Sequence, residues 1–323
     1  MQPSTPFQKQ FNTYLKQELN RFDSYVLSEQ VHYFLSIGGK RLRPVLMLMA
    51  ADLFDADSQK SLPAAIALEL FHNFTLVHDD MMDDASLRRG EQTTHVKFGF
   101  NSALLTGDLL LVYAYTYLQK ADILHKENAW QLFNTTAAQV CEGQQYDLAF
   151  ENSRKVAVKD YMKMIELKTA VLLGTCLKMG VLISGGDEED QANMYEFGRC
   201  LGISFQLQDD ILDTFGKEDS FGKKVGGDIL QDKKTFLLLR AFEKADNDQI
   251  EKLTKWIGTK QAPNDKISVV KNIFAKLNVK EEAQKLRNEY YERARTHLDA
   301  VKKPQERKEH LRNFTHNLLF RET

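Results

Sequence analysis

Two clusters of aspartates are the residues of this sequence best suited to chemistry. Each cluster reads acid, acid, two apolar residues, acid. The clusters are Asp79-Asp80-Met81-Met82-Asp83 and Asp209-Asp210-Ile211-Leu212-Asp213. At about 100° per residue, the first and last acid of a cluster lie one turn apart on the same face of a helix. Each cluster therefore directs carboxylates to one side.

Neighbouring carboxylates resist ionising together unless a cation lies among them. Oxygen ligands with no nearby cysteine and no closely spaced pair of histidines favour Mg²⁺ over zinc or copper. Mg²⁺ keeps waters and usually shares its shell with substrate phosphates. The sequence thus predicts a phosphate-bearing ligand clamped between two acidic helix faces. Either cluster alone reads equally well as a solvated acidic turn, but two copies, each after an apolar stretch, make that interpretation less attractive.

Composition favours a large all-α protein. The chain has 323 residues, of which 43% are hydrophobic and 27% charged, and this is ordinary for a globular protein with a sizeable core. No proline lies between Pro63 and Pro263, which suits long helices because helix interiors exclude proline. The formal net charge of -2 gives no electrostatic case for nucleic acid as a partner.

The three cysteines, Cys141, Cys176 and Cys200, lack metal-ligand spacing, and an odd count argues against a disulfide framework. We therefore expect a reducing cytoplasmic location. The first residues lack the pattern of a signal peptide, and the longest uncharged apolar stretch, Leu109 to Gln119, is too short to span a bilayer. No transmembrane segment is predicted.

Helical periodicity dominates the chain, and strand-like alternation is nearly absent. We expect one domain over residues 1–323, an all-α bundle whose helices place functional side chains around a central substrate cavity. Glycine-bearing breaks separate the helices. The predicted helical stretches include residues 44–53, 64–83, 102–119, 130–149, 158–179, 191–213 and 233–244. The last third, from about Asn247, reads as amphipathic outer helices.

Basic groups accompany the acidic clusters. The segment Gly38-Gly39-Lys40-Arg41-Leu42-Arg43-Pro44 places cations at the mouth of a helix, where backbone N–H groups also favour anions. It lacks P-loop spacing, and by itself a solvated basic turn is the simpler reading. Further cations stand at Arg88, Arg89, Lys168, Lys223 and Lys233. Several separate cationic groups suggest that more than one diphosphate binds at once.

Single residues also have simpler interpretations. A lone helical histidine such as His72 or His78 is more often a structural hydrogen-bonding group than a ligand, and only the neighbouring motifs favour a role for His72. Asp84 reads as an exposed charge at the end of its cluster. Phe71 and Phe74 would ordinarily be core residues.

At these residues the chain resembles the trans-prenyl diphosphate synthases, or polyprenyl synthetases, which include the farnesyl and geranylgeranyl diphosphate synthases. The family's motifs occur in order from about residue 34 to residue 235. They are Gly-Gly-Lys-Arg-Leu-Arg-Pro from Gly38, His72, the first aspartate cluster, Arg88-Arg89-Gly90, Gly143-Gln144 with Asp147, Lys168-Thr169, Phe205-Gln206-Leu207-Gln208 with the second cluster, Gly222-Lys223, Gly227-Asp228 and Lys233.

This resemblance implies an all-α enzyme, usually a homodimer, that joins isopentenyl diphosphate to an allylic diphosphate with Mg²⁺. The implied principal Mg²⁺ ligands are Asp79, Asp83 and Asp209, supported by Asp80, Asp210 and Asp213. The implied allylic diphosphate ligands are Arg88, Lys168, Lys223 and Lys233, and those of isopentenyl diphosphate are Gly39, Lys40, Arg43, His72 and Arg89. Thr169 and Gln206 would face the developing allylic cation.

Product length is predicted from the helix before the first cluster. Phe74 lies five residues before Asp79, roughly 7–8 Å along the helix, where a growing hydrocarbon tail would press. In the resembled family a bulky residue there is associated with short products. Thr75 is small, unlike the paired aromatics of animal farnesyl synthases, and the cluster lacks a two-residue insertion. We predict geranylgeranyl diphosphate, then farnesyl diphosphate, with Phe71 as a second floor.

Three alternatives stay open. A class I terpene cyclase shares the first aspartate motif but carries a different second metal motif. It also needs no binding site for isopentenyl diphosphate at Lys40 and Arg43. A long-chain polyprenyl synthase is opposed only by Phe74 and Phe71. A non-catalytic regulatory subunit of another prenyl synthase would be expected to have lost one motif, and none is missing. The sequence leaves open whether Arg321 closes over the site.

Overall fold

The computed structural model describes residues 5–19, 21, 26–123, 126–153, 155–216, 225–259 and 261–320. Its residue contacts divide the chain into two compact units. The first comprises Met1–Gln131 and Cys176–Gln191, and the second comprises Leu132–Thr175 and Ala192–Thr323. The single domain expected over residues 1–323 stays a prediction.

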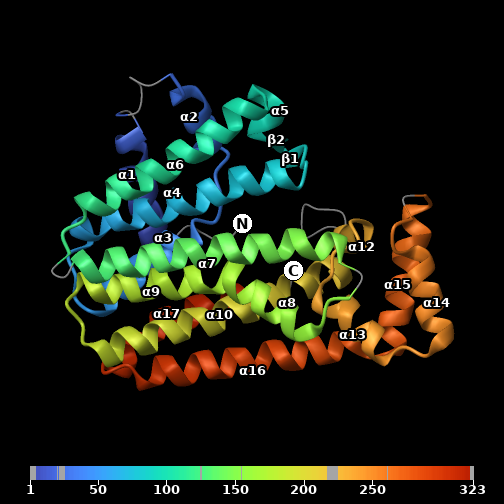
Figure 1. The fold of residues 1–323 in the computed structure, drawn as a ribbon. Helices are drawn as coiled ribbons and strands as arrows, with labels where there is room; N and C mark the ends of the chain where they lie inside the picture. Colours follow the sequence, from blue (N-terminus) through green and yellow to red (C-terminus); the bar gives the residue numbers. More distant parts are fainter. Residues whose placement is uncertain are drawn as a thin grey trace. The chain divides into compact units, whose positions relative to one another are not determined.

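In its described residues, the first unit contains helices and one short hairpin. Its helices are α1 (Pro6–Leu19), α2 (Ser28–Ser36), α3 (Leu42–Leu53), α4 (Ser58–Met82), α5 (Thr94–Phe98) and α6 (Phe100–Lys120). Helices α4 and α6 pack against each other along much of their length (Figure 1). The N-terminus of α4 is capped by Asp57, whose side chain accepts a hydrogen bond from the Gln59 backbone N–H at 2.9 Å.

The hairpin directly follows the first aspartate cluster. Strands β1 (Leu87–Arg88) and β2 (Glu91–Gln92) pair antiparallel, with Arg88 opposite Glu91. The two turn residues, Arg89 and Gly90, have φ of 55° and 87°. Positive φ at both positions is the backbone of a type I′ turn, whose twist matches that of the strands. The sequence showed Arg88-Arg89-Gly90 as a motif. It did not predict the strands, because a strand of two residues is too short to show alternation of apolar and polar residues.

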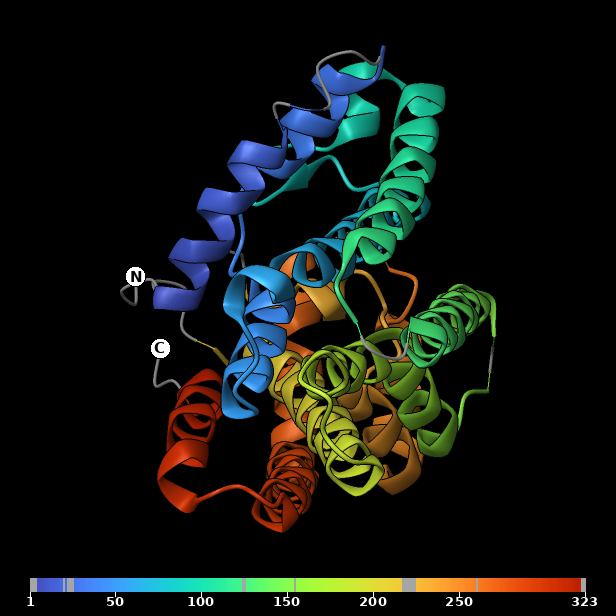
Figure 2. The ribbon, with the colours of Figure 1, turned by 90° about the vertical axis from the view of Figure 1, so that its left-hand side faces the viewer.

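The helices that follow lie wholly or partly in the second unit. These are α7 (Lys126–Asn152), α8 (Val158–Ile165), the π-helix η2 (Glu166–Ala170), α9 (Val171–Ile183), α10 (Glu188–Phe215), α12 (Gly227–Leu230), α13 (Phe236–Lys244), α14 (Asn247–Trp256), α15 (Pro263–Lys276), α16 (Val279–Ala300) and α17 (Gln305–Leu319). Parts of α7, α9 and α10 belong to the first unit. Figure 2 shows α17 turning back beside α16, in red.

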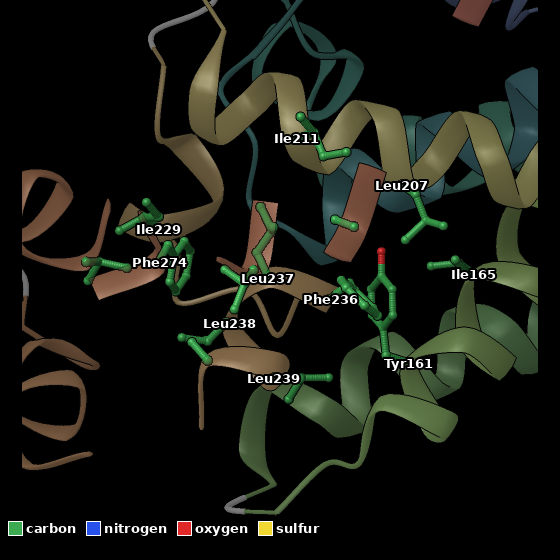
Figure 3. Close-up of a cluster of buried hydrophobic side chains, with 14 of the residues drawn as sticks. Tyr161, Ile165, Leu207, Ile211, Ile229, Phe236, Leu237, Leu238, Leu239 and Phe274 are labelled. Atoms are coloured by element: carbon green, nitrogen blue, oxygen red, sulfur yellow. The ribbon is translucent and has the colours of Figure 1, made fainter. Parts of the chain in front are cut away.

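A hydrophobic cluster lies inside the second unit. Helix α10 contributes Leu207 and Ile211, and α8 contributes Tyr161 and Ile165, all of them buried (Figure 3). Helix α12 adds Ile229, α13 adds the continuous apolar run Phe236–Leu239, and α15 adds Phe274. The hydroxyl of Tyr161 points toward α10 in Figure 3, so this aromatic side chain joins the core to the helix that carries the second aspartate cluster.

A glycine contact brings the backbones of two site-bearing segments together. A Cβ on Gly143 of α7 would lie 2.3 Å from the backbone nitrogen of Lys168, in η2. Only glycine permits so close an approach. The π-turn at Glu166–Ala170 widens the helix where Lys168 and Thr169 project, and such turns are frequent at functional sites.

The all-α fold expected from the sequence is confirmed. Each predicted helical stretch lies in observed helix, with ends within a few residues except for residues 158–179, which divide into α8, η2 and α9, and 233–244, where α13 begins at Phe236. Pro44 falls in the first turn of α3 as predicted. Among the described helices, none has the length and apolar character needed to cross a bilayer.

The Gly143 contact predicts a stability loss. Replacing Gly143 with Ala should lower the free energy of unfolding by roughly 1–3 kcal/mol, because the new methyl group overlaps backbone atoms that cannot rotate away. Urea unfolding of the purified protein measures this. Gln145→Ala, at an exposed position of the same helix, is the control and should change stability little. Equal stability of the two variants would contradict the packing argument.

Candidate active site

The loop before α3 holds a guanidinium group against its glycines. Gly38 and Gly39 have φ of 83° and 135°, and Arg89 donates a hydrogen bond to the carbonyl oxygen of Gly38. A Cβ on Gly39 would lie 2.6 Å from Nη1 of Arg89. Glycine therefore supplies both the left-handed backbone and the space for the side chain. The structure thus brings Gly39 and Arg89 together, and their role as ligands of one diphosphate stays a prediction.

The cations of this loop have different environments. Lys40 is exposed, whereas Arg41 is buried and donates to Glu69 Oε1 at 2.6 Å and to the Leu35 carbonyl oxygen at 2.7 Å. The backbone of Arg41 is left-handed, with φ of 50°. A buried cation needs such partners, since an unpaired one is costly. Arg41 thus anchors the loop to α4 and does not present its charge to solvent, a distinction that the run of basic residues did not reveal.

His72 of α4 is paired with Arg43. Nη1 of Arg43 lies 2.9 Å from Nε2 of His72, and because guanidinium only donates, this histidine nitrogen accepts. Burial, and then the charges of Arg43, Arg89, Arg88 and Arg41, hold the pKa of His72 well below its usual value of 6.5. His72 is neutral at physiological pH. The two predicted isopentenyl diphosphate ligands are therefore in direct contact.

The hairpin aims Arg88 at the first aspartate cluster. Nε of Arg88 donates to Oδ2 of Asp80 at 2.6 Å, and its Nη2 lies 3.8 Å from Oδ2 of Asp79. Asp80 is only 2% exposed; burial raises its pKa, while the contact with Arg88 opposes the rise. Asp83 is exposed at the end of α4. In this unit Asp80 is thus committed to Arg88, and Asp79 and Asp83 lie nearer the surface.

The predicted floor residues lie one turn apart on α4. Phe71 is buried and Phe74 partly buried, with ring centroids 5.7 Å apart. The hydroxyl of Thr75 donates to the carbonyl oxygen of His72 at 2.8 Å, so it faces its own helix. Phe71 and Phe74 form a continuous aromatic surface on α4, on the N-terminal side of the aspartates.

In the second unit, Asp210 is buried and hydrogen bonded on both oxygens. Its Oδ2 accepts from the hydroxyl of Tyr161, and its Oδ1 accepts from Nε2 of Gln206 at 3.0 Å. Burial and the charge of Asp228 raise the pKa of Asp210 to about 8, against the effect of the two hydrogen bonds. Asp210 is therefore a fixed member of a hydrogen-bond network, and its burial favours the protonated form.

That network orients Gln206. Because the amide nitrogen donates to Asp210, the amide oxygen Oε1 turns to Thr169, whose hydroxyl lies 3.5 Å away. Lys168 donates to Oδ2 of Asp147 at 2.6 Å. Lys168, Thr169 and Gln206 thus line one pocket of about 220 Å³. Its lining is Asp147, Tyr161, Met164, Ile165, Lys168, Thr169, Gln206, Asp210, Asp228, Lys233, Lys234 and Thr235.

Asp213 holds the chain segment that returns to this pocket. Its Oδ2 accepts from the backbone N–H of Asp228 at 2.9 Å, and its carbonyl oxygen accepts from that of Gly226 at 2.7 Å. Asp209 is partly exposed one turn earlier on α10. Lys233 is exposed at the pocket, and the predicted ligand Lys223 lies outside the described residues.

A buried lysine from α15 braces the same segment. Nζ of Lys266 donates to Oδ1 of Asp232 at 2.6 Å and to the carbonyl oxygens of Leu230 and Thr259 at 3.4 and 3.3 Å. Lys266 is only 2% exposed. Lys233 follows Asp232 directly, so the brace fixes the backbone from which the pocket lysine projects.

Comparison with known proteins identifies the family. Residues 24–277, most of the chain, match the family described as polyprenyl synthetase. The chain belongs to the polyprenyl synthetase family. A geranylgeranyl diphosphate synthase of Methanosarcina mazei is 40% identical over 214 residues, 66% of either chain. One of Sulfolobus acidocaldarius is 34% identical over 307 residues, which cover 91% of this chain and 92% of the relative.

A solved structure agrees over nearly the whole polyprenyl synthetase chain. A crystal structure of geranylgeranyl pyrophosphate synthase superposes with a TM-score of 0.90 at 40% identity, covering 98% of this chain and 99% of the other. This confirms the predicted helical fold and the predicted enzyme class, a short-chain prenyltransferase.

The donor set of this polyprenyl synthetase fits Mg²⁺. Asp79, Asp83 and Asp209 offer carboxylate oxygens that are not fully buried, and Mg²⁺ is commonly held by one or two carboxylates together with waters and substrate phosphates. Within the described part of the chain, no three acidic, histidine or cysteine side chains form a ready-made metal cage. In each unit, the partly exposed carboxylates suit an ion that completes its shell with water and diphosphate oxygens.

Two residues of this site could not be recognised from the sequence. Tyr161 lies seven residues before Lys168 and carries no local signal beyond an apolar pattern. Lys266 lies in the last third of the chain, after the last of the family's motifs. Both contact residues that are distant in the sequence. The sequence separation is 49 residues between Tyr161 and Asp210, and 34 residues between Lys266 and Asp232. A pattern of neighbours along the chain cannot show such contacts.

The lowered pKa of His72 predicts a pH effect. Above pH 6.5 His72 is neutral whether the chain is folded or unfolded. Below pH 6.5 the unfolded chain gains a proton that the folded protein resists, so stability is lost as pH falls. Between pH 7.5 and pH 5.5, wild type should lose roughly 1 kcal/mol more unfolding free energy than His72→Gln, which keeps an acceptor for Arg43.

Urea unfolding at the two pH values measures the difference. Other titrating groups contribute to both proteins and cancel in the comparison. An equal loss in wild type and variant would show that His72 takes up its proton as readily when folded as when unfolded.

Proposed function

We propose that this protein joins isopentenyl diphosphate to an allylic diphosphate in a Mg²⁺-dependent reaction, with geranylgeranyl diphosphate as its main product and farnesyl diphosphate next. The observation that carries this is the pocket of the second unit. There Lys168 and Lys233, which suit a diphosphate, line the same cavity as the neutral oxygens of Thr169 and Gln206, which suit a carbocation.

The first step is rupture of the allylic carbon–oxygen bond. Its electron pair leaves with the diphosphate, so negative charge develops on the leaving group. Lys168, Lys233 and Arg88 are assigned to hold that group, with Lys223. When bound, Mg²⁺ supplies further positive charge to the departing oxygens, and Asp79, Asp83 and Asp209 are assigned to hold it, supported by Asp80, Asp210 and Asp213.

The remaining allylic cation is stabilised by oxygen dipoles that do not react with it. The amide oxygen of Gln206 is fixed toward Thr169 because the amide nitrogen donates to Asp210. Asp210 is itself hydrogen bonded by the hydroxyl of Tyr161. This chain of hydrogen bonds prevents rotation of the amide. A rotated amide would present its N–H groups, with their partial positive charge, to the cation and would repel it.

The isopentenyl double bond then attacks the cation, a carbon–carbon bond forms, and a proton is lost to the departed diphosphate. Gly39, Lys40, Arg43, His72 and Arg89 are assigned to hold the second diphosphate. His72, neutral and paired with Arg43, keeps that guanidinium oriented without adding a charge. No side-chain nucleophile is required.

Product length is assigned to Phe74, with Phe71 and Thr75 beside it. The two rings form an aromatic surface at the N-terminal side of the aspartates, and a growing hydrocarbon that reaches it must stop or displace a ring. Relatives named as geranylgeranyl diphosphate synthases support the same length. Filling of the available space, and not the chemistry of the step, limits the number of condensations.

A product assay tests the proposal. The protein is incubated with Mg²⁺, labelled isopentenyl diphosphate and, separately, dimethylallyl, geranyl or farnesyl diphosphate, and the dephosphorylated products are separated by length. Geranylgeraniol should dominate, and chelation of the metal should abolish turnover. Asp83→Asn should reduce turnover by roughly 10²-fold or more, because it removes a charged ligand.

Asp84→Asn is the matched control, because Asp84 is the next residue and its side chain is fully exposed. It should retain activity. Farnesol as the main product would support the proposed reaction and indicate a shorter hydrocarbon pocket than the one assigned. Longer alcohols would indicate a long-chain synthase. Absence of elongation from every primer would bring forward a regulatory subunit or a terpene cyclase.

We also assign a cytoplasmic location and a homodimer. The three cysteines are free thiols, which suits a reducing compartment. Helix α6 exposes a stripe of large apolar side chains, with exposed fractions of 59% at Phe100 and 58% at Val112. Leu104 and Leu105 complete it. A stripe of this kind on one helix is buried when a second copy packs on it about a two-fold axis.

The stripe predicts the effect of a charge on association. By light scattering, wild type should have about twice the chain mass of 37.2 kDa. Leu105→Glu combined with Val112→Glu should shift the protein toward the monomer, because burying unpaired carboxylates in an apolar contact is unfavourable. Ile250→Glu, at an exposed apolar position of α14, should leave the mass unchanged. A monomeric wild type would contradict the assignment.

A further inference from the structure

His78 of α4 lies directly on the backbone of α6. A Cβ built on Gly107 would lie 2.2 Å from Nε2 and 2.4 Å from Cδ2 of the imidazole. Real side-chain contacts of a Cβ are never so short, so any residue other than glycine at position 107 would displace the ring. The imidazole of His78 therefore packs directly on the backbone of Gly107, which has no side chain in the way.

The imidazole is held there from several directions. Its Nε2 donates to the carbonyl oxygen of Leu104 at 3.1 Å and lies 3.8 Å from Oδ1 of Asp108. On α4, one turn before it, the ring of Phe74 packs edge-on against it, with centroids 4.9 Å apart at 71°. His78 thus occupies the space between the α6 backbone and the aromatic ring of Phe74.

This packing holds the Phe74 ring on the side that faces α6. A ring that limits the length of a bound hydrocarbon must keep its position, and it does so only if the atoms packed against it do not move. For Phe74 those atoms are the imidazole of His78 and the neighbouring ring of Phe71, 5.7 Å away. The support extends from α6 through His78 to Phe74.

We propose that Gly107 and His78 are specificity-determining residues of this enzyme: together they set the position of the Phe74 ring and thereby the length of the product. The inference rests on the proposed function of Phe74 as a floor. It adds to that function a residue on α6 and a histidine that the sequence showed only as a lone helical imidazole.

The two positions act in opposite directions. Removing the imidazole leaves a space into which the Phe74 ring can withdraw, so His78→Ala should lengthen the product. Adding a methyl group at Gly107 pushes the imidazole toward Phe74, so Gly107→Ala should shorten it. A cavity that differs by one or a few methyl-sized volumes discriminates between ligands by on the order of tenfold, and we expect product ratios to change by about that factor.

The experiment compares product distributions from dimethylallyl diphosphate, labelled isopentenyl diphosphate and Mg²⁺. The proteins are wild type, Phe74→Ala, His78→Ala, Gly107→Ala and the double variant of the last two. Gly180→Ala is the matched control: its methyl group would also crowd a backbone, at 2.6 Å from the Met47 carbonyl oxygen, but in a contact that involves neither His78 nor Phe74. A merely destabilising methyl group lowers the amount of product without changing its length.

The double variant keeps the test usable if Gly107→Ala folds poorly. Without the imidazole, the alanine methyl group at position 107 has room, so the double variant should regain stability and give the longer products of His78→Ala. Such dependence of one substitution on the other is the expected signature of a direct contact.

The outcomes separate the two levels of the argument. Lengthening by Phe74→Ala and by His78→Ala, with shortening by Gly107→Ala and no change by Gly180→Ala, supports the proposal. Lengthening by Phe74→Ala alone, with wild-type products from both His78→Ala and the double variant, overturns it and leaves the floor assignment intact. Wild-type products from Phe74→Ala overturn the floor itself, and no product from wild type overturns the proposed function.

Discussion

Charge held inside a helical protein is the constraint on which the candidate site residues of each unit depend. A carboxylate or guanidinium removed from water is tolerated only with partners that replace the lost hydration. Arg41 has Glu69 and a carbonyl oxygen, Asp80 has Arg88, and Asp210 has a phenol and an amide. Each pair also fixes a side chain in space. The groups that make burial tolerable are therefore the same groups that give the site its geometry.

Close approach of backbones is the second means of positioning. Glycines at the helix contacts let main chains meet where a methyl group would keep them apart, as at Gly143 beside Lys168 and at Gly202 beside Ala170. The π-turn at Lys168 and Thr169 changes the direction of two side chains without breaking the helix. Lys168, Thr169 and Gln206 project from helices in this way. Gly39 and Lys233 lie between helices, where Arg41 and Lys266 fix the backbone.

Much of the fold was predictable because it depends on local pattern. Absence of proline and a period near 3.6 residues predicted the long helices, and the order of motifs predicted the family. The hairpin at Arg88 was missed, because strands of two residues show no alternation. The division of residues 158–183 at the π-turn was also missed, since a widened turn leaves the apolar periodicity almost unchanged.

The sequence by itself determined which chemistry the protein is built for: the residue types of the two acidic clusters, the cations near them, and Thr169 with Gln206. Only the tertiary structure decided what each group does. It made Arg41 an internal anchor and His72 a neutral acceptor, and it brought Tyr161 and Lys266 to the motif residues. The physical reason is that protonation, orientation and burial depend on neighbours distant along the chain, whereas residue type and spacing depend on the chain alone.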